Sequence, residues 1–388
     1  MTHPTERPHI LFLFSDTGGG HRSASEAIIE ALHLEYGDQY STEMVDIFKD
    51  YAPSPLKMLP AMYPRIVKAP RVWELGYNLS DGPMRVSALS AGAWPYVRNA
   101  FRRLIDDHPS DIIVSVHSLA NEPVLRALGT NRPPFVTVVT DLVTTHASWY
   151  HRWVDLCLVP TEAARRRALK LGLKPEQVKV VGLPVAERFC HPPADVSTIR
   201  ARLGWPHDRP MVVLVGGGEG MGPLRETALA ISDANVPLSL AIITGRNKTL
   251  KSRLEATKFS MPNFIYGFVH EMPDFMAAAD VLVTKAGPGT ISEALNAGLP
   301  MILYSHLPGQ ESGNIPYVVT EGAGVWAPRP EKIVRVLKNW LDHPDQHKAA
   351  KAACHHMARP DAARQIAHLL VQTLEAHKNW AGAVPTVK

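Results

Sequence analysis

Two glycine-rich turns stand where a strand-like run passes into a helical pattern, and they are the first candidates for chemistry. The first is 15–21, Ser-Asp-Thr-Gly-Gly-Gly-His, and the second is 216–222, Gly-Gly-Gly-Glu-Gly-Met-Gly. Glycine allows the backbone to approach a ligand closely, and the free N–H groups at a helix start attract anions. Neither turn has the GxGxxG spacing, and no Gly-Lys-Ser/Thr of a P-loop follows the first. The second turn therefore predicts a phosphate or diphosphate site of another kind.

A third constellation lies later in the chain and is the most specific. Residues 284–295, Thr-Lys-Ala-Gly-Pro-Gly-Thr-Ile-Ser-Glu-Ala-Leu, run from a strand into a helix, and 309–314, Gly-Gln-Glu-Ser-Gly-Asn, follow the next strand. Side-chain amides offer both donors and acceptors, which suits the recognition of sugar hydroxyls. Thr290 and Glu293 also have capping-box spacing, and a cap alone would explain Glu293. It would not explain the amide-rich loop.

Imidazole and carboxylate groups stand beside two strand ends. His21 follows the first glycine turn, and the run 140–151 holds Asp141 and His146 next to Trp149. Imidazole is a general base at neutral pH, and open α/β sheets place ligands at the carboxyl ends of their strands. We therefore predict His21 as a catalytic base, with Asp141 or His146 as the orienting or substitute group. The alternative is a surface histidine on a tight turn and a polar loop around a buried tryptophan.

Two series of short apolar runs alternate with helical patterns and position these residues. The predicted strands are 9–15, 43–47, 111–116, 135–140, 155–159 and 178–181, then 211–215, 238–244, 263–266, 280–284 and 300–304. Near-continuous apolar strands separated by helices predict parallel sheets that are covered on both faces. The Pro-rich stretch 189–195 has the composition of a hinge. We expect an α/β chain with domains at 1–188 and 189–355, and an amphipathic helix and tail at 356–388.

The segment 51–103 holds no confident strand and departs from this alternation. It carries a net charge of +6, in a chain whose formal net charge is only +4. Leu, Met, Trp and Tyr residues are interleaved with its cations, which is typical of an amphipathic surface in a membrane interface. The alternative is a helical excursion packed on the first sheet with solvated cations. The predicted membrane and acceptor residues are Arg65, Lys68, Arg71, Trp73 and Trp94.

The composition favours a globular protein. Of the 388 residues, 45% are hydrophobic and 20% are charged, which argues against disorder. The pI of about 8.9 is too mildly basic to predict nucleic-acid binding, and no apolar run is long enough to span a bilayer. Three cysteines without a CxxC pair argue against a disulfide framework and a zinc site. These features predict a cytoplasmic protein that lies peripherally on the inner face of the cell membrane.

The two glycine turns, the run 140–151 and the region 284–314 form blocks with a definite order along the chain. These blocks resemble the monogalactosyldiacylglycerol synthases, the processive diacylglycerol glucosyltransferases and, more distantly, the enzyme that adds N-acetylglucosamine to lipid I. The resemblance covers residues 9–326. It implies the GT-B fold, in which two doubly wound Rossmann-like domains face each other across a cleft. It also implies an inverting enzyme that moves a hexose from a UDP-sugar to the free hydroxyl of 1,2-diacylglycerol. The sequence leaves galactose and glucose open, although Trp149-Tyr150-His151 favours galactose.

The resemblance also assigns donor-binding residues. It places Glu293 on the uridine ribose, the loop at Phe268 and Val269 on uracil, and Gln310, Glu311 and Asn314 at the hexose. The glycines and Thr290 complete this set: Gly19 and Gly20 near the reacting sugar, and Gly217, Gly218, Gly287, Gly289 and Thr290 at the diphosphate. Asp-x-Asp, frequent in metal-dependent transferases, does not occur in the chain. A helix N-terminus can stabilise a leaving diphosphate, so we expect no cofactor and no essential metal.

Three other functions remain open. An NAD-dependent oxidoreductase would need GxGxxG spacing and an acid about 20 residues later, and only the acid, Asp46, is present. A UDP-sugar epimerase would share the donor block and need no lipid-facing surface. A peripheral membrane protein could bind a nucleotide without chemistry. The expected partners are a UDP-sugar, diacylglycerol and an anionic membrane surface.

Overall fold

The computed structural model describes residues 7–17, 19–66, 69–192 and 194–383, with side chains except those of 63–66 and 379–383. The chain forms two compact units. The first comprises Met1–Ala186 together with Asp361–Lys388, and the second comprises Glu187–Pro360. The return of the chain to the first unit after residue 360 differs from the domain order expected from the sequence.

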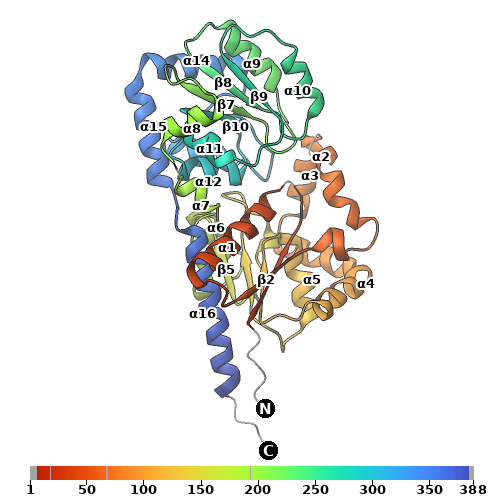
Figure 1. Cartoon of the computed structure of the whole chain (residues 1–388). Coiled ribbons are helices and arrows are strands. Elements are labelled where there is room, and N and C mark those ends of the chain that lie inside the picture. Colours follow the sequence, from red (N-terminus) through yellow and green to blue (C-terminus); the bar gives the residue numbers. More distant parts are fainter. Residues whose placement is uncertain (1–6, 18, 67–68, 193, 384–388) are drawn as a thin grey trace, which may run out of the picture. The chain divides into compact units, whose positions relative to one another are not determined.

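The first unit is built on a parallel six-stranded sheet in the order β2-β1-β3-β4-β5-β6 (Figure 1). Its strands are β1 (His9–Phe14), β2 (Ser41–Asp46), β3 (Ile112–Ser115), β4 (Phe135–Val138), β5 (Leu156–Val159) and β6 (Val178–Val180). Alternate side chains of β1 enter two separate cores, Leu11 and Leu13 on one face and Ile10 and Phe12 on the other. Because both faces are buried, the strand is apolar from Ile10 to Phe14.

Helices cover both faces of this sheet. They are α1 (Gly20–Tyr36), η1 (Ile47–Tyr51), η2 (Leu56–Met58), α2 (Leu59–Ile66), α3 (Pro70–Ser80), α4 (Pro83–Asp107), α5 (Ser118–Leu128), η3 (Ala147–Trp149), α6 (Glu162–Lys170), η4 (Pro175–Gln177) and α16 (Ala362–Ala383). The C-terminal helix α16 buries Ile366, Leu370 and Leu374 in the same core as Ile28 and Leu32 of α1. The apolar side of this amphipathic helix is thus buried in the first unit.

The second unit repeats the architecture, with a parallel sheet in the order β12-β11-β10-β7-β8-β9 (Figure 1). Its strands are β7 (Met211–Val215), β8 (Ser239–Ile243), β9 (Asn263–Tyr266), β10 (Val281–Lys285), β11 (Met301–Ser305) and β12 (Gly324–Trp326). Its helices are α7 (Glu187–Cys190), α8 (Val196–Leu203), α9 (Leu224–Asp233), α10 (Lys248–Glu255), α11 (Met272–Ala278), α12 (Pro288–Asn296), α13 (Asn314–Thr320), α14 (Pro330–Asp342) and α15 (Pro344–Met357).

The basic segment between β2 and β3 is mostly helical in its described residues and holds no strand there. It forms η1, η2, α2, α3 and the long α4, which continues through Pro95. In the described part of the chain, we find no helix with both the length and the apolar character needed to cross a membrane.

Candidate active site

Three strand ends of the first sheet meet at His21. The residue lies in the first turn of α1, and its Nδ1 is 2.7 Å from the carbonyl oxygen of Val116 and 2.9 Å from Oγ1 of Thr140. A carbonyl oxygen only accepts hydrogen bonds, so Nδ1 must carry the proton. Burial lowers the pKa of His21 to about 4, although the Val116 hydrogen bond and Asp46 act in the opposite direction. The ring is therefore neutral at pH 7, and Nε2 holds a free lone pair.

The loop that presents His21 is held by polar side chains on neighbouring elements. Buried Asp46 accepts the backbone N–H of Asp16 at 3.0 Å, and Arg22 binds the Asp16 carboxylate with two hydrogen bonds of 2.7 and 2.8 Å. Gly19 has a φ of 82° and precedes α1 without a side-chain cap. A Cβ atom at Gly20 would meet open space. The start of α1 is therefore accessible, as an anion or a hydroxyl group requires.

His117 is a member of this cluster that the sequence analysis missed. Its ring centre is 4.5 Å from that of His21, and its side chain is buried. Nδ1 of His117 accepts the backbone N–H of Leu119, so in the neutral ring Nε2 donates to Oγ1 of Thr17 at 3.2 Å. Burial, together with the neighbouring His21, lowers the pKa of His117 well below its usual value. The signal in the sequence was its position directly after a predicted strand, where Asp141 also lies.

The structure separates the two other predicted catalytic residues. Buried Asp141 accepts the indole N–H of Trp149 at 2.6 Å, and the Trp149 ring lies 6.2 Å from that of His21. His146 instead faces α3. Its Nδ1 accepts the backbone N–H of Ser148, and its Nε2 is 3.2 Å from Oγ of Ser80. Both ring nitrogens of His146 are thus used within the protein, whereas Asp141 is linked to the His21 cluster through one tryptophan.

In the second unit, the predicted donor residues follow strands β7, β9, β10 and β11, of which β7, β10 and β11 are neighbours. The loop after β7 packs on the turn after β8, because a Cβ atom at Gly220 would lie only 2.2 Å from the carbonyl oxygen of Thr244. Gly217 has a φ of 69°, a conformation that favours glycine. The backbone N–H of Arg246 donates to the carbonyl oxygen of Gly218 at 2.8 Å.

Glu293 is not a helix cap. Helix α12 begins at Pro288 with Gly287 as its N-cap residue, so Thr290 and Glu293 lie inside the helix. Among the residues that the structure describes, no side chain or backbone group pairs with the Glu293 carboxyl. Burial raises its pKa to about 7. A partly buried carboxyl without a partner is costly to the fold, which is typical of a group that binds a ligand.

The amide-rich loop contributes to the scaffold as well as to a possible sugar site. Glu311 is buried, and its two oxygens accept from Nζ of Lys285 at 2.5 Å and from the backbone N–H of Leu307 at 2.6 Å. Asn314 is buried and donates from Nδ2 to the carbonyl oxygen of Ala286 at 2.9 Å. Within the described residues, Oδ1 of Asn314 has no hydrogen-bond partner. Gln310 is partly exposed.

In the predicted uracil loop, the guanidinium of Arg246 stacks on the ring of Phe268. Phe268 follows β9 and is 47% exposed, and Val269 beside it is partly exposed. The Arg246 guanidinium lies 4.6 Å from the centre of the Phe268 ring and bonds to Glu219 of the glycine loop at 2.9 Å. Arg246 therefore connects the loop after β7 with the loop after β9.

Helix α3 has two chemically different faces. On one face, the hydroxyl of Tyr77 donates to the carbonyl oxygen of Thr144, and Ser80 contacts His146. On the other face, Val72, Leu75 and Leu79 are 69%, 60% and 62% exposed. Their spacing of three and four residues aligns them along one side of the helix.

The predicted membrane residues only partly coincide with this exposed face. Arg71 is exposed beside it, whereas Trp73 is half-buried. Trp94 packs against the core of the first unit, with Arg126 5.2 Å from its ring centre. Lys68 lies outside the described residues, and the side chain of Arg65 is not described. In the described part of this segment, the most exposed large apolar side chains are not the two tryptophans but Val72, Leu75 and Leu79 of α3 and Met84 and Leu89 of α4.

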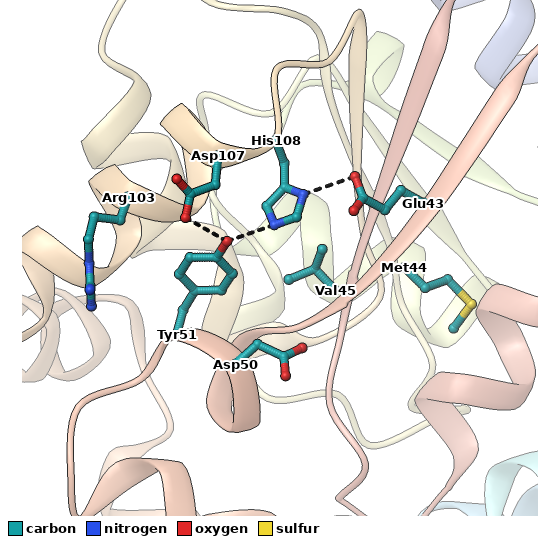
Figure 2. Close-up of a pocket in the computed structure, with 8 residues that line it drawn as sticks. All are labelled: Glu43, Met44, Val45, Asp50, Tyr51, Arg103, Asp107 and His108. Atoms are coloured by element: carbon teal, nitrogen blue, oxygen red, sulfur yellow. Dashed lines mark hydrogen bonds and ion pairs between the residues drawn. The ribbon is translucent and has the colours of Figure 1, made fainter.

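A cavity of about 410 Å³ lies elsewhere in the first unit, between β2 and the end of α4 (Figure 2). The Tyr51 hydroxyl donates to Asp107 at 2.9 Å and contacts Nε2 of His108 at 2.7 Å, while Nδ1 of His108 is 2.9 Å from Glu43. None of the predicted site residues lines this cavity. Its polar groups pair with one another, and they join η1 to α4 and β2.

Two family models match successive parts of this chain, in the same order as the sequence blocks described above. Residues 21–185 match the family model of monogalactosyldiacylglycerol (MGDG) synthase, and residues 211–366 match the glycosyltransferase family 28 C-terminal domain. Monogalactosyldiacylglycerol synthase 1, chloroplastic, from Arabidopsis thaliana is 38% identical over 94% of this chain and 70% of its own length. Monogalactosyldiacylglycerol synthase, chloroplastic, from Spinacia oleracea is 38% identical over 94% of this chain and 72% of its own length.

The chain belongs to the monogalactosyldiacylglycerol synthase family. It is a glycosyltransferase, and the family resemblance inferred from its motifs is confirmed. The structure of MurG from Acinetobacter baumannii has a TM-score of 0.60 at 15% identity, over 94% of this chain and 99% of that one. The S. aureus MnaA-UDP co-structure has a TM-score of 0.63 at 14% identity, over 96% and 97%. At this identity the likeness shows the fold, which is the predicted GT-B fold.

The predicted localisation is wrong. The names of both plant members of the synthase family carry the word chloroplastic, which contradicts a cytoplasmic enzyme on the inner face of the cell membrane. The prediction rested on composition and cysteine use. Neither of these distinguishes one reducing compartment from another.

Proposed function

We propose that the protein is an inverting glycosyltransferase that moves galactose from UDP-galactose to the free hydroxyl of 1,2-diacylglycerol. The observation that carries this proposal is the 2.7 Å contact between Nδ1 of His21 and the carbonyl oxygen of Val116, in a member of this family. The names of the related enzymes support galactose as the sugar and diacylglycerol as the acceptor. The product is a β-linked membrane glycolipid.

His21 is the proposed base. The Val116 carbonyl fixes the proton on Nδ1, so the neutral ring can accept the acceptor's hydroxyl proton at Nε2. The hydroxyl oxygen then forms a bond to C1 of the sugar. The bond between C1 and the diphosphate oxygen breaks, and its electron pair leaves with UDP. One displacement inverts the anomeric centre, so an α-linked donor gives a β-glycoside.

The second unit is the proposed donor site. The unpaired carboxyl of Glu293 is suited to accept hydrogen bonds from the two ribose hydroxyls, since such bonds would offset the cost of its burial. Gly289 and Thr290 at the start of α12 are partly exposed, and a Cβ at Gly289 would meet open space. We propose that the diphosphate binds there without an essential metal ion.

The exposed side of α3 is the proposed contact with the lipid surface. Diacylglycerol remains in a bilayer, so the enzyme must reach it there. Exposed aliphatic residues on α3 lie beside exposed cations of the same segment, which suits an anionic membrane surface. The opposite side of α3 contacts the loop 144–148, so this surface is joined to the part of the first unit that carries Asp141.

A reconstituted assay tests the proposal. The full chain is incubated with diacylglycerol vesicles and either UDP-galactose or UDP-glucose, with and without EDTA, and free UDP and the lipid product are measured. We expect β-galactosyldiacylglycerol by the anomeric proton coupling, at the same rate in EDTA. An α-linked product would overturn single displacement. Release of UDP without a glycolipid would overturn the acceptor, and preferential use of UDP-glucose would overturn the donor.

A further inference from the structure

The ammonium group of Lys285 lies between two of the glycine loops. Its Cε is 3.6 Å from the point where a Cβ of Gly217 would stand, and its Nζ is 3.0 Å from the corresponding point at Gly287. Lys285 ends strand β10, which pairs with β7 on one side and β11 on the other. A cation is thus fixed at the place where two backbone loops without side chains come together.

We propose that Lys285 is a donor-binding residue that contacts the diphosphate and stabilises it as it leaves, and that Glu311 is the positioning residue that holds Lys285 there. This inference rests on the proposed function, because it takes a nucleoside diphosphate as the ligand of the second unit. It gives Glu311 a role different from the sugar contact that the sequence predicts.

In this ion pair both oxygens of the carboxylate are engaged, whereas the ammonium has N–H donors left over. Glu311 is 6% exposed, and each of its oxygens already accepts one hydrogen bond, from Lys285 and from the backbone N–H of Leu307. Lys285 is 25% exposed, and an ammonium group has three N–H donors. One donor reaches Glu311, so two remain for an incoming anion.

The absence of side chains at the two glycines leaves this ammonium within reach of a ligand. An alanine at position 287 would bring its Cβ to 3.0 Å from Nζ, which is closer than most side-chain contacts. The φ of 69° at Gly217 already favours glycine there, so the close approach at Gly287 is the stronger indication. A phosphate group needs backbone N–H groups and a cation on the same side.

The role in transfer requires no proton movement at Lys285. When the bond between sugar C1 and the diphosphate oxygen breaks, the electron pair stays on that oxygen and its negative charge grows. The ammonium remains protonated and donates a stronger hydrogen bond to the more negative oxygen. Lys285 therefore contributes to UDP binding and further to the rate of transfer.

The test compares two ligands that differ only in the diphosphate, UDP and uridine, by calorimetry. For Lys285→Met we expect UDP affinity to fall about 10- to 100-fold while uridine affinity stays within about twofold. Lys285→Arg should retain most of the UDP affinity. The matched control is Lys338→Met, which removes the same charge from the exposed side of α14 in the same unit. Equal losses for UDP and uridine, or an equal loss in the control, would overturn the role.

A second set of variants separates ligand binding from folding. Lys285→Met leaves the buried Glu311 carboxylate without its partner and can unfold the unit. The double variant Lys285→Met/Glu311→Gln removes that charge, and we expect it to fold and to show the same selective loss for UDP. Glu311→Gln alone should lower UDP affinity by about 3- to 10-fold and leave uridine binding unchanged, since Lys285 is less firmly held.

Two results overturn this inference in different ways. A double variant that binds UDP as tightly as the wild type would show that Lys285 is only a structural partner, while the proposed donor stands. A wild-type chain that binds neither UDP nor uridine would overturn the proposed donor itself, and with it the ligand assigned to Lys285.

Discussion

Nδ1 of His21 donates a hydrogen bond to the carbonyl oxygen of Val116 at 2.7 Å. In a hydrolase triad, a carboxylate holds the corresponding ring nitrogen and stabilises the protonated imidazole. A backbone carbonyl fixes the same tautomer but carries no full charge. The carbonyl orients the His21 base and raises its pKa, but burial lowers this pKa by more, so the ring is neutral at pH 7.

Removal of the imidazole should impair transfer but not donor binding. We expect His21→Ala to lower kcat by about 100-fold or more, because the acceptor hydroxyl loses its base, while UDP affinity by calorimetry stays within about twofold. The control is His33→Ala, an exposed histidine on the same helix. A His21→Ala enzyme with wild-type kcat would remove His21 from the mechanism.

Glu293 should make uridine binding depend on pH. The ionised carboxylate accepts hydrogen bonds from the ribose hydroxyls, and burial raises its pKa to about 7, so affinity should fall as the pH drops below 7. Glu293→Gln should bind uridine about 10- to 150-fold more weakly at pH 8 and show no such pH dependence. Uridine is the preferred probe because it has no phosphate that titrates in this range. A flat wild-type profile between pH 5 and 8 would contradict this role.

The same carboxyl should cost stability at alkaline pH. Its pKa is raised in the folded state, so the protonated form favours folding, and this contribution is lost as the pH rises through 7. At pH 8, the free energy of unfolding of Glu293→Gln should therefore be about 1–3 kcal/mol higher than that of the wild type. At pH 5, the two free energies of unfolding should be similar. Urea denaturation at the two pH values measures this difference. A variant less stable at pH 8 would indicate a structural partner for Glu293.

Gln310 should help to distinguish the two hexoses. Galactose and glucose differ only in the orientation of the 4-hydroxyl, so a pocket must separate them with placed hydrogen-bond partners. We expect Gln310→Ala to reduce kcat/KM for UDP-galactose and to shrink its preference over UDP-glucose by about 5- to 150-fold. If activity falls equally with both donors, Gln310 binds the sugar without reading that hydroxyl. The same comparison would then be made at Asn314.

The exposed face of α3 should control binding to vesicles. Leu75→Glu/Leu79→Glu should reduce co-sedimentation with anionic vesicles by about 10-fold or more, since apolar area is lost and anions are added. Leu34→Glu on α1, which is 54% exposed, is the control. Binding of the wild type should weaken with salt. Equal binding of the wild type to neutral and anionic vesicles at low salt would show that the cations play no part.

The fold was predictable because buried parallel strands are apolar on both faces. Such runs stand out in the sequence, and eleven of the strands were expected close to where they lie. Strand β12 was missed since its three residues, Gly324–Trp326, are too short to show a pattern. The placement of α16 was also missed: periodicity identifies an apolar stripe on a helix but not the core that receives it.

The site was less predictable, because its roles depend on contacts between distant loops. The spacing of Thr290 and Glu293 suggested a capping box, with Thr290 as the N-cap residue and Glu293 three residues into the helix, but the helix already starts at Pro288. Lys285 and His117 are ordinary residues in sequence, and only the packing of neighbouring strand ends brings them to Gly217 and His21. Trp73 and Trp94 were expected at a membrane surface because they are aromatic, but both are partly buried in the first unit. Burial of a large ring contributes more to stability than its exposure to water.

The order in which the chain is made bears on how the first unit matures. Its sheet is synthesised first, but Ile366, Leu370 and Leu374, which close one of its two cores, emerge from the ribosome only after the whole of the second unit. Until then, the apolar side chains of Ile28 and Leu32 lack part of their cover and are a target for chaperones. The unit that begins first is thus completed last. A chain truncated near residue 360 would hold a complete second unit joined to a first unit with one core uncovered.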